Sequence, residues 1–148
     1  MTAIVDLNGA KTLIDERGNF RRIPSWIQIE AIADFQRAHP RAELRRRLGY
    51  GEDETIVANI GTVCERKGQH TFIRAVAHFN RQHAGAGRHR FLLVGGRAGV
   101  YLDLLREEIT RLGIANLEII METREAYQYF QAADLFVKPT RMLEGFGL

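Results

Sequence analysis

The chain has 148 residues, of which 45% are hydrophobic and 26% charged, so its length and composition fit one ordinary soluble globular domain. They exclude the disordered, collagen-like and coiled-coil classes, and no apolar run reaches the ~20 residues that a membrane span requires. The first residues lack the basic start and apolar core of a signal peptide. A single cysteine, Cys64, gives no disulfide framework and favours a reducing compartment, so we expect a cytoplasmic protein.

The net charge of +3 is modest, and its densest cluster is the arginine run at positions 45–47. One interpretation is a surface for an anionic partner such as nucleic acid. The other is a solvated helix face that pairs with Glu43, Glu52 and Asp53. We favour the second interpretation and expect no nucleic-acid binding, because no aromatic residues alternate with the arginines.

The first 50 residues predict a lead-in segment with a short strand at Phe20–Ile23. Two short helices are expected at 29–35 and 42–48, separated by His39-Pro40. Residues 51–148 then predict a partial α/β unit, because short apolar, β-branched runs alternate with helical periodicity. The four buried parallel strands are expected at residues 55–60, 91–94, 117–120 and 134–137.

The predicted crossover helices follow the first three strands. Phe72, Val76 and Phe79 share one helical face, and residues 102–112 repeat the same spacing until Gly113 ends the helix. After the third strand, we expect Thr123 to cap a short helix that carries Tyr127 and Phe130 inward. The fold class is therefore α/β, a Rossmann-like doubly wound parallel sheet with helices on both faces.

Ligands of doubly wound sheets bind beyond the carboxyl ends of the strands, where the strand order reverses. With the order 3-2-1-4, the loops to inspect follow Ile60 and Val137. In the first loop, Gly61 lets the backbone approach a ligand, and Lys67 stands at the entrance of the next helix, where an anion is favoured. The spacing does not match the phosphate loop of ATPases.

The second loop carries two glycines around an aromatic residue, directly after an acid. Its amides could cradle a diphosphate while the carboxylate of Glu144 takes sugar hydroxyls. An oxidoreductase is disfavoured, because the glycines at 95, 96 and 99 have the wrong spacing and follow the second strand.

Four segments carry a resemblance to family 4 (group 1) retaining glycosyltransferases of the GT-B fold. Residues 60–68 resemble the segment V-G-R-L-x-x-x-K-G, and residues 91–96 resemble L-x-L-V-G-x-G. Residues 132–148 are similar to the block A-A-D-x-x-V-x-P-S-x-x-E-G-F-G-L, and residues 23–27 match the entry into the second domain. The resemblance covers most of the chain and implies the donor half of a GT-B enzyme, ending inside the E-x7-E motif.

The resemblance implies a role for each matching residue. Glu144 would hold donor-sugar hydroxyls, and Lys67 would contact the donor diphosphate together with Gly61, Thr62, Gly145, Phe146, Gly147 and Leu148. The nucleotide base would be bordered by Gly95, Met121, Glu122 and Thr123. No metal or other cofactor is implied, and the substrate would be a UDP- or GDP-linked sugar.

The chain departs from the family pattern in four places. Thr62 replaces an arginine, Met121 replaces a common glycine, and the loop before Glu144 is one residue longer. The second glutamate of the motif would fall at position 152, past the last residue. The family's catalytic histidine belongs to the other domain, so we assign no catalytic residue here and expect the five histidines (39, 70, 78, 83 and 89) to lie at the surface.

The parent enzyme would transfer a sugar to a glycan or lipid-linked acceptor, and the fragment alone would be inactive. The alternative is a non-catalytic α/β interaction module that degenerated from such a domain. Because the fourth strand would form an uncovered edge, we expect self-association through Leu135 to Val137. A lipid-linked acceptor would also favour peripheral membrane association of the parent enzyme.

Overall fold

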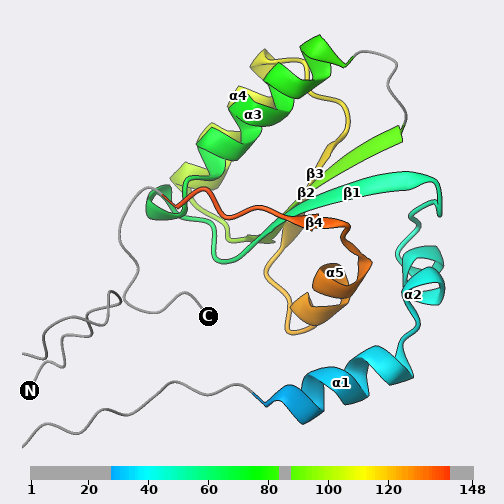
Figure 1. Ribbon diagram of the computed structural model, residues 1–148. Coiled ribbons are helices and arrows are strands. Elements are labelled where there is room, and N and C mark those ends of the chain that lie inside the picture. The colour runs from blue at the N-terminus through cyan, green and yellow to red at the C-terminus, as the bar shows by residue number, and fades with distance from the viewer. Residues whose placement is uncertain (1–27, 84–87, 141–148) are drawn as a thin grey trace, which may run out of the picture.

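The computed structural model describes residues 28–83 and 88–140, so the strand expected at Phe20–Ile23 lies outside the described residues. Two helices, α1 (Ile29–Ala38) and α2 (Arg41–Arg47), precede the sheet, as predicted. The other elements are β1 (Glu54–Ile60), the 3-10 turn η1 (Glu65–Lys67), α3 (Gln69–Gln82), β2 (Arg88–Gly96), α4 (Val100–Arg111), β3 (Leu117–Met121), α5 (Ala126–Ala132) and β4 (Leu135–Phe136) (Figure 1).

The strands form one parallel sheet in the order β3-β2-β1-β4. This is the predicted order, with the reversal between β1 and β4. Val57 of β1 is in register with Phe91 on one side and with Leu135 on the other. Because all strands run in the same direction, the loops that follow them meet at a single edge, called the carboxyl edge below.

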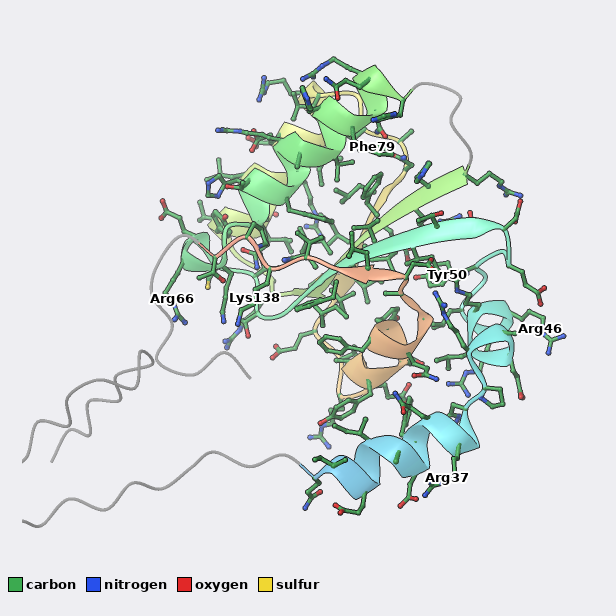
Figure 2. All side chains as sticks on the ribbon, in the orientation of Figure 1. Arg37, Arg46, Tyr50, Arg66, Phe79 and Lys138 are labelled. Carbon is green, nitrogen blue, oxygen red and sulfur yellow. The ribbon has the colours of Figure 1, made fainter. Side chains whose placement is uncertain are left out.

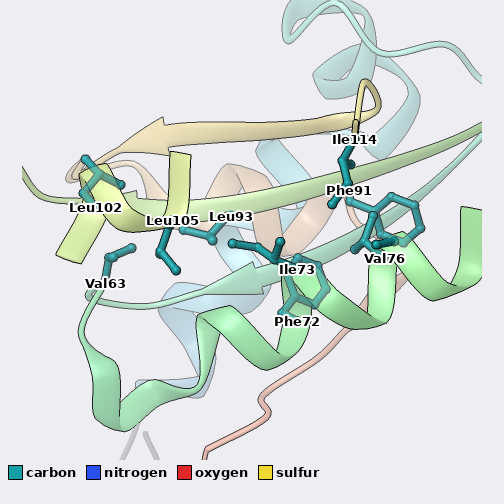
Figure 3. Close-up of a cluster of buried hydrophobic side chains, with 10 residues drawn as sticks. Val63, Phe72, Ile73, Val76, Phe91, Leu93, Leu102, Leu105 and Ile114 are labelled. Atoms are coloured by element: carbon teal, nitrogen blue, oxygen red, sulfur yellow. The ribbon is translucent and has the colours of Figure 1, made fainter. Parts of the chain in front are cut away.

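Helices cover both faces of the sheet, with α3 and α4 on one side and α5, together with α2, on the other (Figure 1). The spacing of Phe72, Ile73, Val76 and Ala77 gives α3 a continuous apolar face against β2. Figure 3 shows this cluster, which α4 completes with Leu102 and Leu105. Each of these large side chains is fully buried or nearly so and contributes about 1.5–3 kcal/mol.

The prediction for α5 was right in place and wrong in orientation. Its buried positions are Gln128 and Ala132, whereas Tyr127 is 62% exposed and Phe130 is 46% exposed. The two aromatic rings lie outside the core: Tyr127 contacts the ring of Phe35 in α1, and Phe130 contacts that of Phe136 in β4. The small Ala132 and the polar Gln128 face the interior, so the larger rings of Tyr127 and Phe130 lie on the outer side of the helix.

The expected helix cap at Thr123 is also wrong. The capping position of α5 is Glu125, and no side chain caps the helix. The Oγ1 atom of Thr123 instead accepts a hydrogen bond from the backbone N–H of Glu125 at 3.1 Å. Thr123 thus stabilises the turn before α5 and keeps a position at the carboxyl edge.

The arginine run does not form a uniformly solvated face. Arg45 is 6% exposed, and its Nε donates to the carbonyl of Ala132 at 2.9 Å. Its Nη1 donates to the carbonyl of Glu54 at 3.2 Å, while Nη2 pairs with the carboxylate of Asp134, which Arg41 also contacts. Arg46 is exposed and points away from the sheet (Figure 2). The expected side-chain partners Glu43, Glu52 and Asp53 pair with none of the three arginines.

Three of the histidines depart from the surface prediction. His39 is half-buried, and its ring packs against that of Phe35 in α1. His78 and His83 are exposed as expected. His70 is half-buried, with its Nδ1 3.2 Å from the hydroxyl of Tyr101. His89 is half-buried too, and its ring packs edge-on against Phe79. Both bridge elements of the fold, so their role is in packing.

Candidate functional site

An open pocket of about 150 Å³ lies at the carboxyl edge of the sheet. It is formed by the ends of β1 and β2, the loop after β1, the loop after β3 and the start of α5. Its lining consists of Ile60, Gly61, Thr62, Val94, Gly95, Glu122, Thr123 and Ala126. Predicted site residues from two loops and the end of β2 therefore meet in one place, although Gly61 and Thr123 lie 62 positions apart in the sequence.

The floor of the pocket is backbone. Gly95 has a φ of 108°, and a Cβ atom at this position would lie 2.3 Å from the carbonyl oxygen of Gly61. The N–H of Gly61 donates to Val94 O at 2.9 Å, and the N–H of Val63 donates to Gly95 O at 3.1 Å. Only glycine permits this close approach, so Gly95 holds the first loop against the end of β2.

Gln69 supports the same loop, and sequence reasoning missed it. Its side chain is 1% exposed, and its Nε2 donates to the carbonyl of Thr62 at 3.1 Å. The signal was present in the sequence, because Gln69 precedes Phe72, Ile73 and Val76 on the apolar face of α3. A polar residue at a core position of a helix is informative, since it needs a hydrogen-bond partner there.

Lys67 lies where the sequence predicted it, directly before the first turn of α3. It ends η1, its N–H donates to Cys64 O at 3.0 Å, and Gly68 follows in the left-handed region with a φ of 72°. Its side chain is half-buried and does not line the pocket. Arg66 precedes it, and Lys138 follows β4 at the same edge of the sheet (Figure 2).

The chain after β4 is held by Asn59, a second residue that sequence reasoning missed. Asn59 is 3% exposed, and its Nδ2 donates to Val137 O at 2.8 Å. The N–H of Val137 donates to Ala58 O at the same distance. These bonds fix the chain directly after β4, whereas Glu144 and residues 145–148 lie outside the described residues.

The loop after β3 places two of its three predicted residues in the pocket. Glu122 and Thr123 line it, whereas Met121 is 44% exposed and does not. The N–H of Glu122 donates to Gly96 O at 2.7 Å, which extends the pairing of β3 with β2 beyond the regular ladder. This bond places the side chain of Glu122 at the pocket.

Three charged side chains at this edge are not neutralised within the described part of the chain. The side chains of Glu122, Arg97 and Arg124 are exposed and form no ion pair or hydrogen bond with another described residue. Within the same residues, no group of three or more His, Cys, Asp or Glu side chains could hold a metal ion. No described helix is long and apolar enough to span a membrane.

The geometry suits a ligand with a flat ring and an anionic group. A pocket with a backbone floor accepts a ring, and the neighbouring entrance of α3 offers free amides and a lysine for an anion. Its position beyond the carboxyl ends of parallel strands is where nucleotides bind in doubly wound α/β folds. The fold and the position of the pocket thus define an α/β domain of the Rossmann-like, doubly wound type.

Comparison with known protein families shows the family to which the chain belongs. Residues 40–148 match the family model described as glycosyl transferases group 1, and the chain belongs to this family. A GDP-mannose-dependent alpha-(1-6)-phosphatidylinositol monomannoside mannosyltransferase of Mycobacterium tuberculosis is 33% identical over 117 residues, covering 73% of this chain and 29% of the relative. A D-inositol 3-phosphate glycosyltransferase of Acidothermus cellulolyticus is 30% identical, covering 98% of this chain and 32% of the relative.

Solved structures show the same fold. Anabaena HepE, in complex with UDP and glucose, superposes with a TM-score of 0.60 at 27% identity, covering 72% of this chain and 28% of HepE. WaaG, a glycosyltransferase involved in lipopolysaccharide biosynthesis, gives a TM-score of 0.59 at 20% identity over 68% of this chain and 26% of WaaG. The chain spans about a third of the length of the curated relatives that it matches.

Proposed function

We propose that this chain is the donor-binding part of a glycosyltransferase that moves a sugar from a nucleotide-diphosphate sugar to a glycan or lipid-linked acceptor. The observation that carries the proposal is the pocket, because residues from the loops after β1 and β3 and from the end of β2 assemble there at the expected edge of the sheet. Family membership and the UDP-bound neighbour support a nucleotide-sugar donor.

The proposed roles follow from chemistry and position. Lys67 supplies a point charge for the diphosphate at the entrance of α3, and a charge-assisted hydrogen bond there is worth about 1.5–3 kcal/mol. Gly61 and Thr62 approach the same group, together with the amides of residues 145–148. Glu144 holds sugar hydroxyls. Catalysis in the parent enzyme then depends mainly on electrostatic stabilisation of the departing diphosphate.

One observation favours a second candidate, a non-catalytic module derived from such a domain. Thr62 replaces the arginine of the family pattern, so the pocket has one phosphate cation fewer. Retained nucleotide binding separates the two candidates, because a module used only for protein contacts has no reason to keep it. In both cases we expect the 148-residue chain alone to show no sugar transfer.

Calorimetric titration of this chain with UDP, GDP and ADP tests the proposal. We expect saturable binding of one nucleotide, weakened about tenfold or more in Lys67→Ala, which corresponds to the loss of one charge-assisted bond. Arg81→Ala is the matched control, since it removes a cation from the last turn of α3, at the opposite end of that helix from Lys67. Absence of binding, or equal loss in both variants, would contradict the donor-site assignment.

The proposal extends to the partners and location of the parent enzyme. Leu135 and Phe136 are 55% and 42% exposed on β4, which pairs with β1 on one side, and this supports self-association through the edge. Light scattering tests it, with Leu135→Lys expected to lower the molar mass toward that of a monomer. Peripheral membrane association and a cytoplasmic location remain part of the proposal, and vesicle sedimentation and cell fractionation test them.

A further inference from the structure

One acidic side chain in the pocket has no role in the proposed handling of sugar and phosphate. Glu122 lines the pocket, is exposed, and its carboxylate has no hydrogen-bond or ion-pair partner among the described residues. Its backbone is nevertheless fixed, because its N–H donates to Gly96 O at 2.7 Å. Arg106 of α4 does not pair with Glu122: it pairs with Asp103 at 3.2 Å and contacts the sulfur of Met121, the residue before Glu122.

A carboxylate offers only acceptors, so its ligand must present donors. Guanine presents two adjacent donors on its Watson–Crick edge, the N1–H and the N2 amino group, and a carboxylate can accept both at once. Uracil presents a single N–H between two carbonyl oxygens, which the carboxylate repels. Adenine and cytosine present an amino group beside an acceptor nitrogen, so they also satisfy only one carboxylate oxygen.

Thr123 complements this pattern. Its Oγ1 already accepts the N–H of Glu125 at 3.1 Å, which leaves the hydroxyl hydrogen to donate to an acceptor in the pocket that it lines. On guanine, the O6 carbonyl adjoins the N1–H and would receive this hydrogen. A cavity of about 150 Å³ is on the scale that accommodates an aromatic ring.

We propose that Glu122 is the specificity-determining residue for the base of the donor, and that the site selects guanine nucleotides. Glu122 accepts the N1–H and the N2 amino group of guanine, while Thr123 donates to O6. This inference rests on the proposed function, since it names the substrate class of the same site.

Titration of the 148-residue chain with GDP, IDP, UDP and ADP tests the inference. IDP keeps the N1–H and O6 of GDP and lacks only the N2 amino group. We expect GDP to bind most tightly, IDP about tenfold more weakly, and UDP and ADP more weakly still, because a lost charged hydrogen bond is worth about one order of magnitude in affinity. In Glu122→Gln, we expect GDP affinity to fall at least tenfold and the ratio of GDP to IDP affinity to approach one.

Glu125→Gln is the matched control, because it removes a nearby exposed acid that does not line the pocket. It should leave the order of the four nucleotides unchanged. Tighter binding of UDP or ADP than of GDP, or an unchanged ratio of GDP to IDP affinity in Glu122→Gln, overturns the base assignment and leaves the donor site standing. No binding of any nucleotide, with no difference between the chain and Lys67→Ala, overturns the proposed function together with this inference.

Discussion

The two ends of the sheet are built on opposite electrostatic principles. At the amino ends of the strands, charges are paired within the protein: Arg90 lies 3.0 Å from Glu54 and 3.9 Å from Glu118, while Arg45 pairs with Asp134. At the carboxyl edge, the pocket is lined by glycine backbone, and three charged side chains there, Glu122, Arg97 and Arg124, have no such partner among the described residues. Pairs within the protein stabilise the fold, whereas an unpaired charge beside a pocket is available to a ligand. The contrast therefore separates residues that hold the domain together from those that recognise a substrate.

The pKa values at the amino end agree with this division. A hydrogen bond from Arg90, aided by the N–H of Gly51, lowers the pKa of Glu54 below its usual range. Burial acts to raise the pKa of Asp134, but hydrogen bonds from Ile56 N–H and two arginines outweigh it and lower the pKa. Both carboxylates are thus stabilised in their charged forms by the folded state.

The largest expected effect is at Gly95, where the backbone of the carboxyl edge is most closely packed. Gly95→Ala should lower the free energy of unfolding by about 4 kcal/mol, because backbone strain and a clash with Gly61 O each cost roughly 1–3 kcal/mol. Gly113→Ala is the control, since Gly113 also has a positive φ but has open space around it. Urea denaturation measures the free energy of unfolding of both variants. If Gly95→Ala loses no more than Gly113→Ala, the backbone has shifted to relieve the clash between the new Cβ and Gly61 O.

Arg45→Ala should cost about 3 kcal/mol, because it removes a buried guanidinium that satisfies two carbonyls and a carboxylate. Arg46→Ala, one residue along the same helix and exposed, should change stability by less than about 0.5 kcal/mol. Thermal unfolding of the pair measures the difference. If the two variants have similar melting temperatures, the bonds from Arg45 in α2 to Ala132 and Asp134, next to β4, do not stabilise the fold.

Glu54→Gln should cost about 2 kcal/mol at pH 7, from the loss of charged hydrogen bonds at a side chain that is 7% exposed. Because the folded pKa of Glu54 and Asp134 is lowered, their contribution is present above the unfolded pKa of about 4 and is lost as the pH falls through the folded values. Stability should therefore decline between about pH 5 and pH 2, less steeply in Glu54→Gln. If the free energy of unfolding falls with pH equally in the unmodified chain and in Glu54→Gln, the carboxylate of Glu54 does not contribute to this pH dependence.

The sheet and its order were predictable from the sequence, and the reason is physical. Buried parallel strands must be continuous apolar runs, so the pattern at residues 55–60 and 91–94 defines them without knowledge of their neighbours. The strand order also predicted that the site would lie among the loops of the carboxyl edge. Four of the residues predicted for it, Gly61, Gly95, Glu122 and Thr123, line the pocket.

The errors have one cause, which is that local patterns do not encode distant partners. Arg45 seemed to belong to an exposed charged run, yet its flexible stem reaches a carbonyl 87 positions away. Tyr127 and Phe130 have helical spacing, but spacing does not tell which face meets the sheet when α1 and β4 also offer apolar contacts. Asn59 and Gln69 were missed for the same reason. A polar residue within an apolar strand or helix indicates a buried hydrogen bond, but the local pattern does not identify the partner.

The smallest effect is expected for the unpaired arginines of the carboxyl edge, and it is the sharpest test of the comparison. Arg97→Gln and Arg124→Gln, alone or combined, should change the free energy of unfolding by less than about 0.5 kcal/mol, since neither side chain has a partner to lose among the described residues. The amino end offers Arg90→Gln as the counterpart, where loss of the bond to Glu54 should lower stability measurably. Urea denaturation of these variants at pH 7 compares the two ends under one condition. If the carboxyl-edge variants destabilise the protein as much as Arg90→Gln does, the charges of Arg97 and Arg124 contribute to the fold, and the contrast between them and the paired charges of the amino end is wrong.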